Sequence, residues 1–219
     1  MKERVALTPE LVLQAYAIGV FPMAETRDDP ELFFVDPSKR GVLPLDHFHI
    51  PRSLAKTVRR GVFEMRCNSD FEGVLQGCAE PAEGRPDTWI NDEIVRLFLE
   101  FRQMGVAHSV ESWRDGRLVG GLYGLALGGA FFGESMFSRE TDASKVALVD
   151  LIARLRLGGF VLLDTQFVTS HLTRFGALEI PREEYKIKLA EALTVAARFP
   201  TGDVRHAYSE VLQSSSQTS

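Results

Sequence analysis

Three polar side chains stand in segments of this 219-residue sequence that are otherwise apolar. Glu134 lies within an aromatic, glycine-containing run over residues 131–138, and Asp164 and Gln166 end a second apolar run that begins at residue 160. A charge among aromatic side chains is costly unless it is paired or used. If both runs are strands, they bring carboxylates and an amide to one pocket, where such groups can bind a cation or handle a proton.

The same residues also have simpler interpretations. Glu134 could be a structural ion paired with Arg139 or Lys145. Asp164 and Gln166 could merely end a strand and cap a turn. The residue pattern alone leaves both interpretations open.

The composition predicts a globular protein. Hydrophobic residues make up 45% of the sequence, enough for one large domain or two small ones. No apolar stretch approaches the roughly 18 residues that span a bilayer, and the first residues lack a signal-peptide core, so we expect no membrane segment and a cytoplasmic protein. Cys67 and Cys78 fit neither a zinc site nor a disulfide framework. We therefore assign no metal and no cofactor.

A basic island interrupts an acidic sequence. The formal net charge is -5, yet residues 51–66 hold five basic residues against one acid. The spacing of Lys56, Arg59 and Arg60 places them on one face of a predicted helix, and Arg52 precedes them. By itself, such a face is either a solvated surface or a site for nucleic-acid phosphates.

Helix signals dominate the first half of the chain. We predict helices over residues 9–18, 54–60, 69–79 and 91–105, with loops and short strands over residues 23–51. Their starts carry the N-cap residues Thr8, Ser53 and Asn91 and a capping box of Ser69 with Glu72. Residues 80–87 read as a loop, and we place a domain boundary there.

The pattern changes to strands after residue 105. We predict an antiparallel meander with strands over residues 108–113, 117–127 and 131–136. A helix over 142–157, a buried strand over 160–167 and a helix over 181–198 follow. The predicted fold class is α/β (α+β), with a small N-terminal α/β domain (1–87), a mixed-sheet C-terminal domain (88–200) and a disordered polar tail (201–219).

The element order of the C-terminal domain resembles the N-acetyltransferase-like (GNAT) core, a mixed sheet that splays open to admit an acyl donor. Other segments are more specific: Tyr16-Ala17-Ile18-Gly19-Val20-Phe21-Pro22, Thr88-Trp89-Ile90, His108-Ser109-Val110-Glu111, Gly120-Gly121-Leu122-Tyr123-Gly124, the run from Gly133 to Arg139, and Asp164-Thr165-Gln166. Together and in this order, over residues 11–181, they resemble the leucyl/phenylalanyl-tRNA–protein transferases.

The resemblance implies transfer of Leu or Phe, with Met as a further donor, from aminoacyl-tRNA to the N-terminal amine of a protein that begins with Arg or Lys. The product would be marked for degradation as an N-degron. The resemblance further implies that Gln166 accepts a hydrogen from the attacking amine, that Asp164 holds Gln166, and that Glu134 lies beside the aminoacyl group. An aminoacyl ester is already activated, so the reaction needs no metal and no covalent enzyme intermediate. We expect a monomer.

The resemblance also implies two binding surfaces. An apolar pocket for the aminoacyl side chain, which would exclude β-branched and charged side chains, would be formed by Leu122, Phe131, Leu151 and Leu155. Contacts with tRNA would come from Arg52, Lys56, Arg59 and Arg60 at phosphates, from Trp89 beside the terminal adenosine, and from Phe33 and Phe34, where the family usually has two Trp.

Three other functions compete with this one. An acyl-CoA N-acetyltransferase would need a glycine-rich pyrophosphate loop before the helix at residue 143, but residues 138–142 hold two acids and no glycine. A peptidoglycan aminoacyl-tRNA transferase shares the donor but is normally a longer, two-lobed chain. A non-catalytic module that binds aminoacyl-tRNA or a cationic N-terminus predicts the same binding without turnover.

Overall fold

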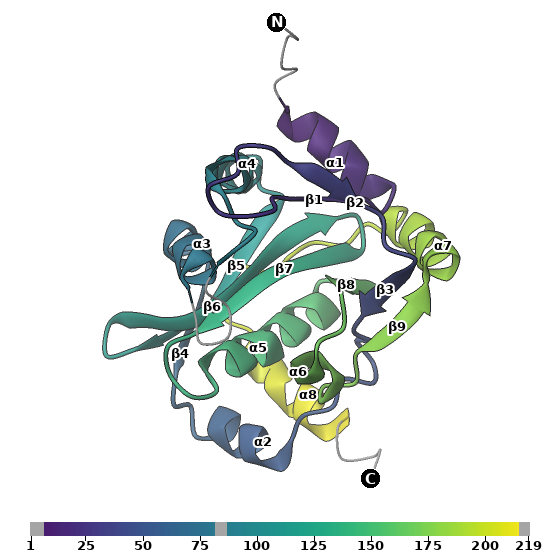
Figure 1. The fold of residues 1–219 in the computed structure, drawn as a ribbon. Helices are drawn as coiled ribbons and strands as arrows, with labels where there is room; N and C mark the ends of the chain where they lie inside the picture. The colour runs from purple at the N-terminus through teal and green to yellow at the C-terminus, as the bar shows by residue number, and fades with distance from the viewer. Residues whose placement is uncertain (1–6, 82–86, 215–219) are drawn as a thin grey trace, which may run out of the picture.

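A mixed β-sheet forms the centre of the molecule in the computed structural model, which describes residues 7–81 and 87–214 (Figure 1). Its strands are β3 (Lys39–Val42), β4 (Glu64–Cys67), β5 (Ala107–Arg114), β6 (Arg117–Leu127), β7 (Ala130–Ser138), β8 (Leu162–Gln166) and β9 (Leu178–Pro181). They form a seven-stranded sheet in the order β4-β5-β6-β7-β8-β3-β9. Neighbouring strands are antiparallel except for β7 and β8, which are parallel. A separate antiparallel ribbon pairs β1 (Phe21–Met23) with β2 (Phe33–Val35).

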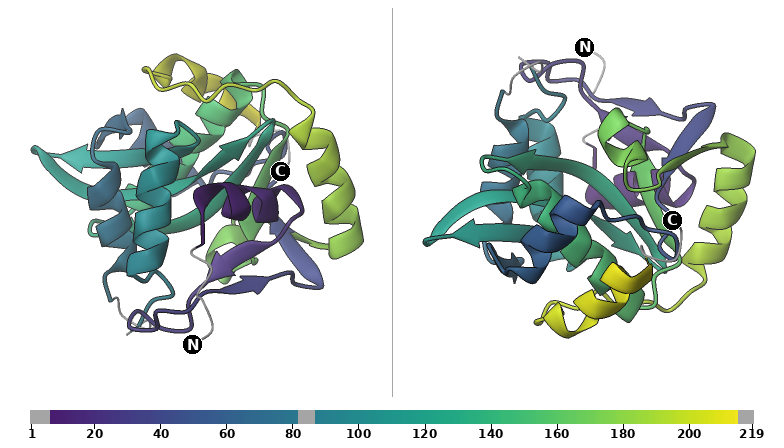
Figure 2. Two further views of the ribbon diagram at one scale, coloured as in Figure 1. Left: turned by 90° about the horizontal axis from the view of Figure 1, so that it is seen from above. Right: turned by 90° about the horizontal axis from the view of Figure 1, so that it is seen from below.

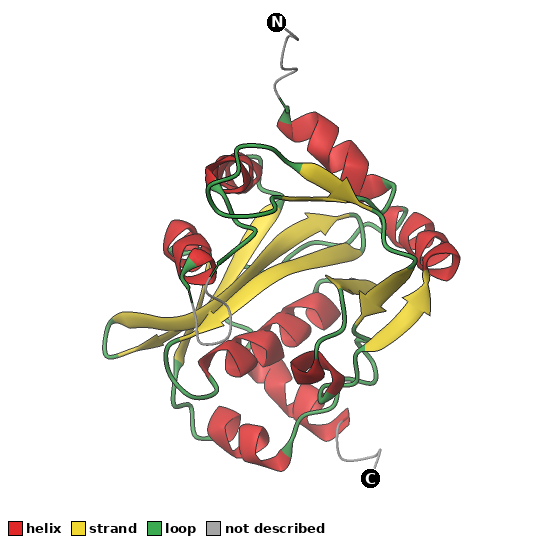
Figure 3. Ribbon diagram, in the orientation of Figure 1, coloured by secondary structure: helices red, strands yellow, loops and turns green. Residues whose placement is uncertain are grey.

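Helices cover both faces of this sheet (Figures 2 and 3). They are α1 (Pro9–Ala17), α2 (Arg52–Arg59), α3 (Phe71–Ala79), α4 (Asp92–Gln103), α5 (Ala143–Leu157), α6 (Ser170–Thr173), α7 (Arg182–Leu193), the 3-10 turn η1 (Arg205–Ala207) and α8 (Tyr208–Ser214). Within the described residues, no helix combines the length and the apolar character that a bilayer crossing requires.

Two hydrophobic cores lie on opposite faces of the sheet. Successive strand residues alternate between them: Leu122 and Phe131 join the core of α5, α2 and α8, whereas Tyr123 and Phe132 join the core of α1, α3 and α4. This arrangement confirms the predicted mixed α+β class.

The predicted boundary near residue 87 does not separate two sheets. β3 lies between β8 and β9, and β4 pairs with β5, so strands from the first 87 residues belong to the central sheet. The strands β4 and β9 were not predicted, because they are four residues long and carry mostly exposed or half-buried side chains that give no clear alternation. Residues 82–86 of the predicted boundary loop lie outside the described residues.

Two predicted helix caps were wrong. The helix α2 begins after Pro51, so Ser53 lies inside it, and α3 is capped by the side chain of Asp70 rather than Ser69. Ser69 instead donates its backbone N–H (2.8 Å) and its hydroxyl to Glu111, which is fully buried. A buried carboxylate needs such donors, and this long-range demand overrides the local capping signal.

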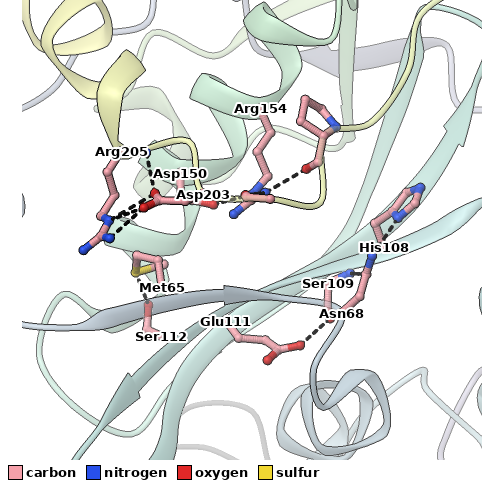
Figure 4. A network of polar contacts seen from close by, with 12 residues as sticks. Met65, Asn68, His108, Ser109, Glu111, Ser112, Asp150, Arg154, Asp203 and Arg205 are labelled. Carbon is pink, nitrogen blue, oxygen red and sulfur yellow. Dashed lines mark hydrogen bonds and ion pairs between the residues drawn. The ribbon is translucent and has the colours of Figure 1, made fainter.

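The prediction of a disordered tail was wrong for residues 205–214, which form η1 and α8. The chain from Pro200 onward is held to α5 by the buried side chains of Asp150 and Arg154, both labelled in Figure 4. Arg154 donates to Asp150 at 2.5 Å and to the carbonyl oxygens of Pro200 and Gly202, and Tyr208 donates to Asp150 at 2.5 Å. The polar composition of residues 205–214 therefore gave no indication that this segment packs against α5. Residues 215–219 lie outside the described residues.

Candidate active site

The strands β7 and β8 separate in the middle of the sheet. They pair along Ala130–Phe132 and Leu162–Asp164, and beyond these residues β7 runs on to Ser138 while β8 ends at Gln166. This leaves a local separation between the two strands. It brings the two polar segments singled out in the sequence to the same opening.

A bulge on each strand lies at the separation. Tyr123 pairs with Ser135 and Gly124 with Gly133, so Glu134 is an extra residue on β7. On β8, Thr165 is extra in the same way against β3. Because a bulge re-aims the side chains around it, both interruptions help to turn polar groups toward the opening.

Glu134 is nearly buried and accepts two hydrogen bonds. Tyr16 donates its hydroxyl to Oε1 at 2.9 Å, and Gln166 donates from Nε2 to Oε2 at 3.0 Å. Burial outweighs both hydrogen bonds and raises the pKa of Glu134 to about 8. Burial, followed by the charge of Glu134, raises the pKa of Tyr16 well above its ordinary value. The carboxyl therefore titrates close to neutral pH.

Asp164 is fully enclosed by donors. The guanidinium of Arg40 donates from Nε to Oδ1 at 2.9 Å and from Nη2 to Oδ2 at 2.6 Å, and the Tyr185 hydroxyl donates to Oδ2 at 2.7 Å. The backbone N–H of Gln166 donates to Oδ1 at 2.7 Å. Asp164 thus contacts the backbone of Gln166, while the side chain of Gln166 is held by Glu134.

A cavity of 1120 Å³ opens at the separation of β7 and β8. Glu134 and Gln166 are among its polar lining residues. Its apolar lining includes Leu122, Met136, Leu148, Leu151, Leu163, Met23, Trp89 and Phe167. The lining thus places a carboxyl and an amide beside an apolar volume large enough for an aminoacyl group.

Two of the four predicted pocket residues lie elsewhere. Leu122 and Leu151 line the cavity, but Phe131 and Leu155 do not and are 0% exposed. Phe131 lies where β7 is still paired with β8, and Leu155 lies near the C-terminal end of α5. Both side chains belong to the hydrophobic core that α5, α2 and α8 share.

The predicted tRNA-contacting side chains are accessible. Arg52, Lys56 and Arg59 on α2 and Arg60 just after it are exposed, and none has an ion-pair partner within the described residues. Trp89 is half-buried and lines the cavity. Phe33 and Phe34 on β2 are 47% and 42% exposed. These groups are free to meet a ligand, although α2 and the cavity are separate features of the surface.

The alternative ion pairs for Glu134 are not formed. Arg139 pairs with Glu80 at 2.6 Å, and Lys145 pairs with Asp142 at 2.7 Å. The contacts made by Glu134 are to a hydroxyl and an amide instead. A group held by neutral donors keeps its capacity to take up or release a proton.

Sequence reasoning missed three residues of this network: Tyr16, Arg40 and Tyr185. Tyr16 belongs to the first of the segments that carry the family resemblance, and Arg40 lies outside all of them. Their partners lie 118 and 124 residues further along the chain, so no local pattern reveals the pairing. The one signal in the sequence was the presence of Tyr16 in a segment that carries the family resemblance.

The described part of the chain contains no group of three or more His, Cys, Asp or Glu side chains arranged to hold a metal ion. The polar groups that line the opening include the carboxyl of Glu134 and the amide of Gln166, and the Tyr16 hydroxyl donates to that carboxyl. These groups can orient and charge-match a reactant.

The fold and the site define an α+β protein in which a separation between two parallel strands opens into a cavity with polar and apolar walls. The sequence matches the family model for leucyl/phenylalanyl-tRNA protein transferase over residues 42–190 and the model for the N-terminal domain of that transferase over residues 6–38. The chain belongs to this family, and it is an aminoacyltransferase.

Two similar proteins carry the name leucyl/phenylalanyl-tRNA–protein transferase. The one from Paramagnetospirillum magneticum is 62% identical over 193 residues, covering 88% of this chain and 92% of its own. The one from Maricaulis maris is 57% identical over 210 residues, covering 96% and 97%. A solved structure of a functionally unknown conserved protein from Staphylococcus epidermidis is 10% identical with a TM-score of 0.42, covering 82% of this chain and 66% of its own. At that level the structural similarity implies neither fold nor function.

Proposed function

We propose that this protein transfers Leu or Phe, with Met as a further donor, from aminoacyl-tRNA to the N-terminal amine of proteins that begin with Arg or Lys. The names of the two relatives give leucyl- or phenylalanyl-tRNA and a protein as the reactants. The added residue forms a new peptide bond and makes the acceptor an N-degron. Since charged tRNA is a cytoplasmic substrate, the proposal also assigns the protein to the cytoplasm, acting as a monomer.

The observation that carries the proposal is the 3.0 Å contact between Gln166 Nε2 and Glu134 Oε2. Because the amide nitrogen faces Glu134, the amide oxygen of Gln166 is turned away from it and is free to accept a hydrogen bond. Gln166 lines the cavity, so an attacking amine bound there can donate to this oxygen. An amide oxygen is too weak a base to keep the proton, so its role is to orient the amine.

The reaction needs little beyond this orientation. The amine nitrogen attacks the ester carbonyl carbon, the new C–N bond forms, and the C–O bond to the ribose breaks. One proton leaves the nitrogen, and the released ribose oxygen gains one. The ester is already activated, so holding the two reacting atoms about 3–3.5 Å apart supplies a large part of the rate enhancement.

Of the two acids Glu134 and Asp164, Glu134 is the better placed to bind the cationic side chain of the acceptor. It lines the cavity, whereas Asp164 is fully enclosed and its oxygens are occupied by Arg40, Tyr185 and the backbone of Gln166. A bound ammonium or guanidinium group would lower the raised pKa of Glu134 and favour its charged form. A cationic acceptor thereby creates the charge that holds it.

The apolar wall suits the donor side chain. Leu122, Met136, Leu148, Leu151 and Leu163 supply aliphatic surface, and Met136 can adapt its shape. A Leu or Phe side chain would be shielded from water against these residues, whereas a charged side chain would be left without a partner.

The exposed cations of α2 suit contacts with the tRNA backbone. Phosphate contacts of this kind position an RNA without reading its sequence. The half-buried Trp89 can stack a base of the acceptor end at the cavity, where each stacked base is worth about 1–3 kcal/mol. The donor would then be held by its stem at one place and by its aminoacyl end at another.

The test is transfer of labelled Leu from charged leucyl-tRNA to a peptide that begins with Arg. The same peptide beginning with Ala, the Arg peptide with its amine acetylated, and acetyl-CoA as a parallel donor are the controls. The proposal predicts transfer to the free Arg peptide, far less to the Ala peptide, and none in the other two arms.

Each other outcome rejects a distinct part of the proposal. Equal transfer to Arg and Ala peptides would remove the acceptor specificity. Tight binding of charged tRNA without transfer would make the protein a binding module, and acetyl transfer alone would make it an acetyltransferase.

A further inference from the structure

Arg40 is a buried cation on β3 that makes contacts with three other parts of the fold. It is 1% exposed, and its guanidinium forks onto Asp164 of β8 at 2.9 and 2.6 Å. Its Nη1 donates to the carbonyl oxygen of Gly19 at 2.9 Å, just after α1. Burial by itself would lower the pKa of Arg40, but the hydrogen bonds and the charge of Asp164 raise it, so the guanidinium stays charged.

Aromatic rings complete the enclosure of this guanidinium. Its central carbon lies 4.4 Å from the ring centroid of Phe21 and 4.6 Å from that of Tyr185. The hydroxyl of Tyr185 also donates to Asp164 at 2.7 Å. The Arg40–Asp164 pair is thus fixed from both sides, and little freedom remains for the carboxylate.

The fixed carboxylate holds an unusual backbone conformation. The N–H of Gln166 donates to Asp164 Oδ1 at 2.7 Å, and Gln166 has a φ of 61°, in the left-handed region that a residue with a side chain rarely adopts. The N–H of Phe167 closes a tight turn onto the carbonyl of Thr165 at 2.6 Å. Without the pair, the backbone of Gln166 would lose the acceptor that holds it in this conformation.

We propose that Arg40 is a positioning residue for the transfer reaction: by holding Asp164 it fixes the backbone of Gln166, and so directs the Gln166 amide toward Glu134 and the cavity. This inference rests on the proposed function. Neither Arg40 nor Asp164 lines the cavity, so both act through Gln166 rather than on the substrate. The Asp164 carboxylate then serves as a hydrogen-bond acceptor for the backbone of Gln166, and the Arg40 guanidinium neutralises its charge.

The proposal separates two roles that a buried ion pair can have. A pair that serves stability alone can often be replaced by apolar side chains of similar size without loss of stability. If this pair also positions Gln166, the same replacement leaves a folded protein with an impaired reaction. The double variant Arg40→Met with Asp164→Leu therefore separates the positioning of Gln166 from the contribution of the ion pair to stability.

Three variants share one assay of Leu transfer to the Arg peptide. The Arg40→Lys variant keeps the charge but loses the fork, and the double variant removes the pair. Tyr185→Phe removes a single donor to Asp164 and is the mildest change. Lys39→Met is the matched control, because Lys39 lies next to Arg40 on the same strand and its ion pair with Glu179 is exposed.

We expect kcat to fall by about 100-fold in Arg40→Lys and in the double variant, with KM for leucyl-tRNA changed by less than about 3-fold. For Tyr185→Phe we expect an intermediate fall in kcat, and for Lys39→Met none. Thermal unfolding of each variant shows which ones are folded, and the mild Tyr185→Phe change keeps the test open if the others do not fold.

A folded double variant or Tyr185→Phe variant with the kcat of the parent would overturn the proposal, as would a rise in KM that accounts for the whole loss. These results would leave the proposed function intact. Absence of transfer by the unsubstituted protein would instead reject the proposed function and, with it, this role for Arg40.

Discussion

At Glu134 an acid is buried beside an apolar cavity, and its titration should be visible in stability. Burial raises its pKa to about 8, whereas a Glu in an unfolded chain has a pKa of about 4.3. The folded state therefore holds this proton at pH values where the unfolded state has lost it, so the contribution of Glu134 to stability falls as pH rises between the two values. For Glu134→Gln, which does not titrate, we expect the free energy of unfolding relative to the parent to increase from about pH 5 to about pH 8.

Denaturant unfolding of both proteins at several pH values measures this difference. Glu183→Gln is the control, because Glu183 is an acid with a 78% exposed side chain on α7. Its stability curve should run parallel to that of the parent. If the curve of Glu134→Gln also runs parallel, Glu134 is not buried with a raised pKa in the folded protein.

The residues of the candidate site could be predicted only in part from the sequence. Glu134 and Gln166 could be nominated because a polar group inside an apolar strand pattern is conspicuous by itself. Arg40 could not, because it stands in a short strand whose burial comes entirely from distant elements. The predicted pocket residue Phe131 lies outside the cavity for a related reason: the alternation along β7 can be read from the residues, but the point at which β7 and β8 part cannot.

At the scale of elements, α2 is a short amphipathic helix. Leu54, Ala55 and Val58 are buried, while the basic side chains point away from the core. For Lys56→Gln combined with Arg59→Gln we expect weaker binding of leucyl-tRNA, with the slope of log affinity against log salt reduced by about 1 for each phosphate that is no longer neutralised. Binding measured over a series of salt concentrations gives this slope.

The control for this experiment removes the same charge elsewhere. Lys39→Gln combined with Lys188→Gln replaces two exposed cations, each paired with an acid. That protein should keep the salt dependence of the parent. A similar reduction in both double variants would mean that overall charge, rather than the α2 face, attracts the tRNA.

Most elements could be placed correctly from sequence because their signals are local. The meander of β5, β6 and β7 follows from strand alternation and turn residues, and Asp115 and Gly116 both have the positive φ that a tight hairpin requires. The bulges at Glu134 and Thr165 were not predictable, because a bulge is a mismatch between two strands and leaves no mark on either strand alone.

At the scale of the whole molecule, a hydrogen bond to a buried carboxyl holds the C-terminal segment, residues 205–214, against α5. Tyr208 donates to Asp150, which is 1% exposed and whose pKa is raised by burial. Removing that hydroxyl in Tyr208→Phe leaves a buried carboxyl with one donor fewer, so we expect a loss of about 1–3 kcal/mol of unfolding free energy. The kcat of transfer should not change, since Tyr208 does not line the cavity between β7 and β8.

Denaturant unfolding and the transfer assay on the same preparation check both parts of this expectation. Ser209→Ala, next to Tyr208 and exposed, is the control and should leave stability unchanged. If Tyr208→Phe is as stable as the parent, the hydrogen bond from Tyr208 to Asp150 does not stabilise the fold. A fall in kcat without loss of stability would connect this segment to the reaction instead.

Strands from both sides of the predicted boundary near residue 87 belong to one sheet. Loop composition near residue 87 suggested a boundary, yet β4 on its N-terminal side forms one edge of the sheet and β3 lies between β8 and β9. β3 is the clearest case, because it pairs with β8 and supplies Arg40 to Asp164. Local composition marks loops well, but long-range pairing decides which strands share a sheet.

The central claim is that the Gln166 amide orients the acceptor amine, and Gln166→Ala tests it most directly. The measurement is the single-turnover rate of Leu transfer to the Arg peptide, made beside the Kd for leucyl-tRNA, with Gln103→Ala on the exposed surface of α4 as control. We predict that Gln166→Ala loses about 100-fold in rate while Kd stays within about 2-fold, and that the control matches the parent. A parent-like rate in Gln166→Ala, or a loss fully explained by weaker tRNA binding, would contradict the claim.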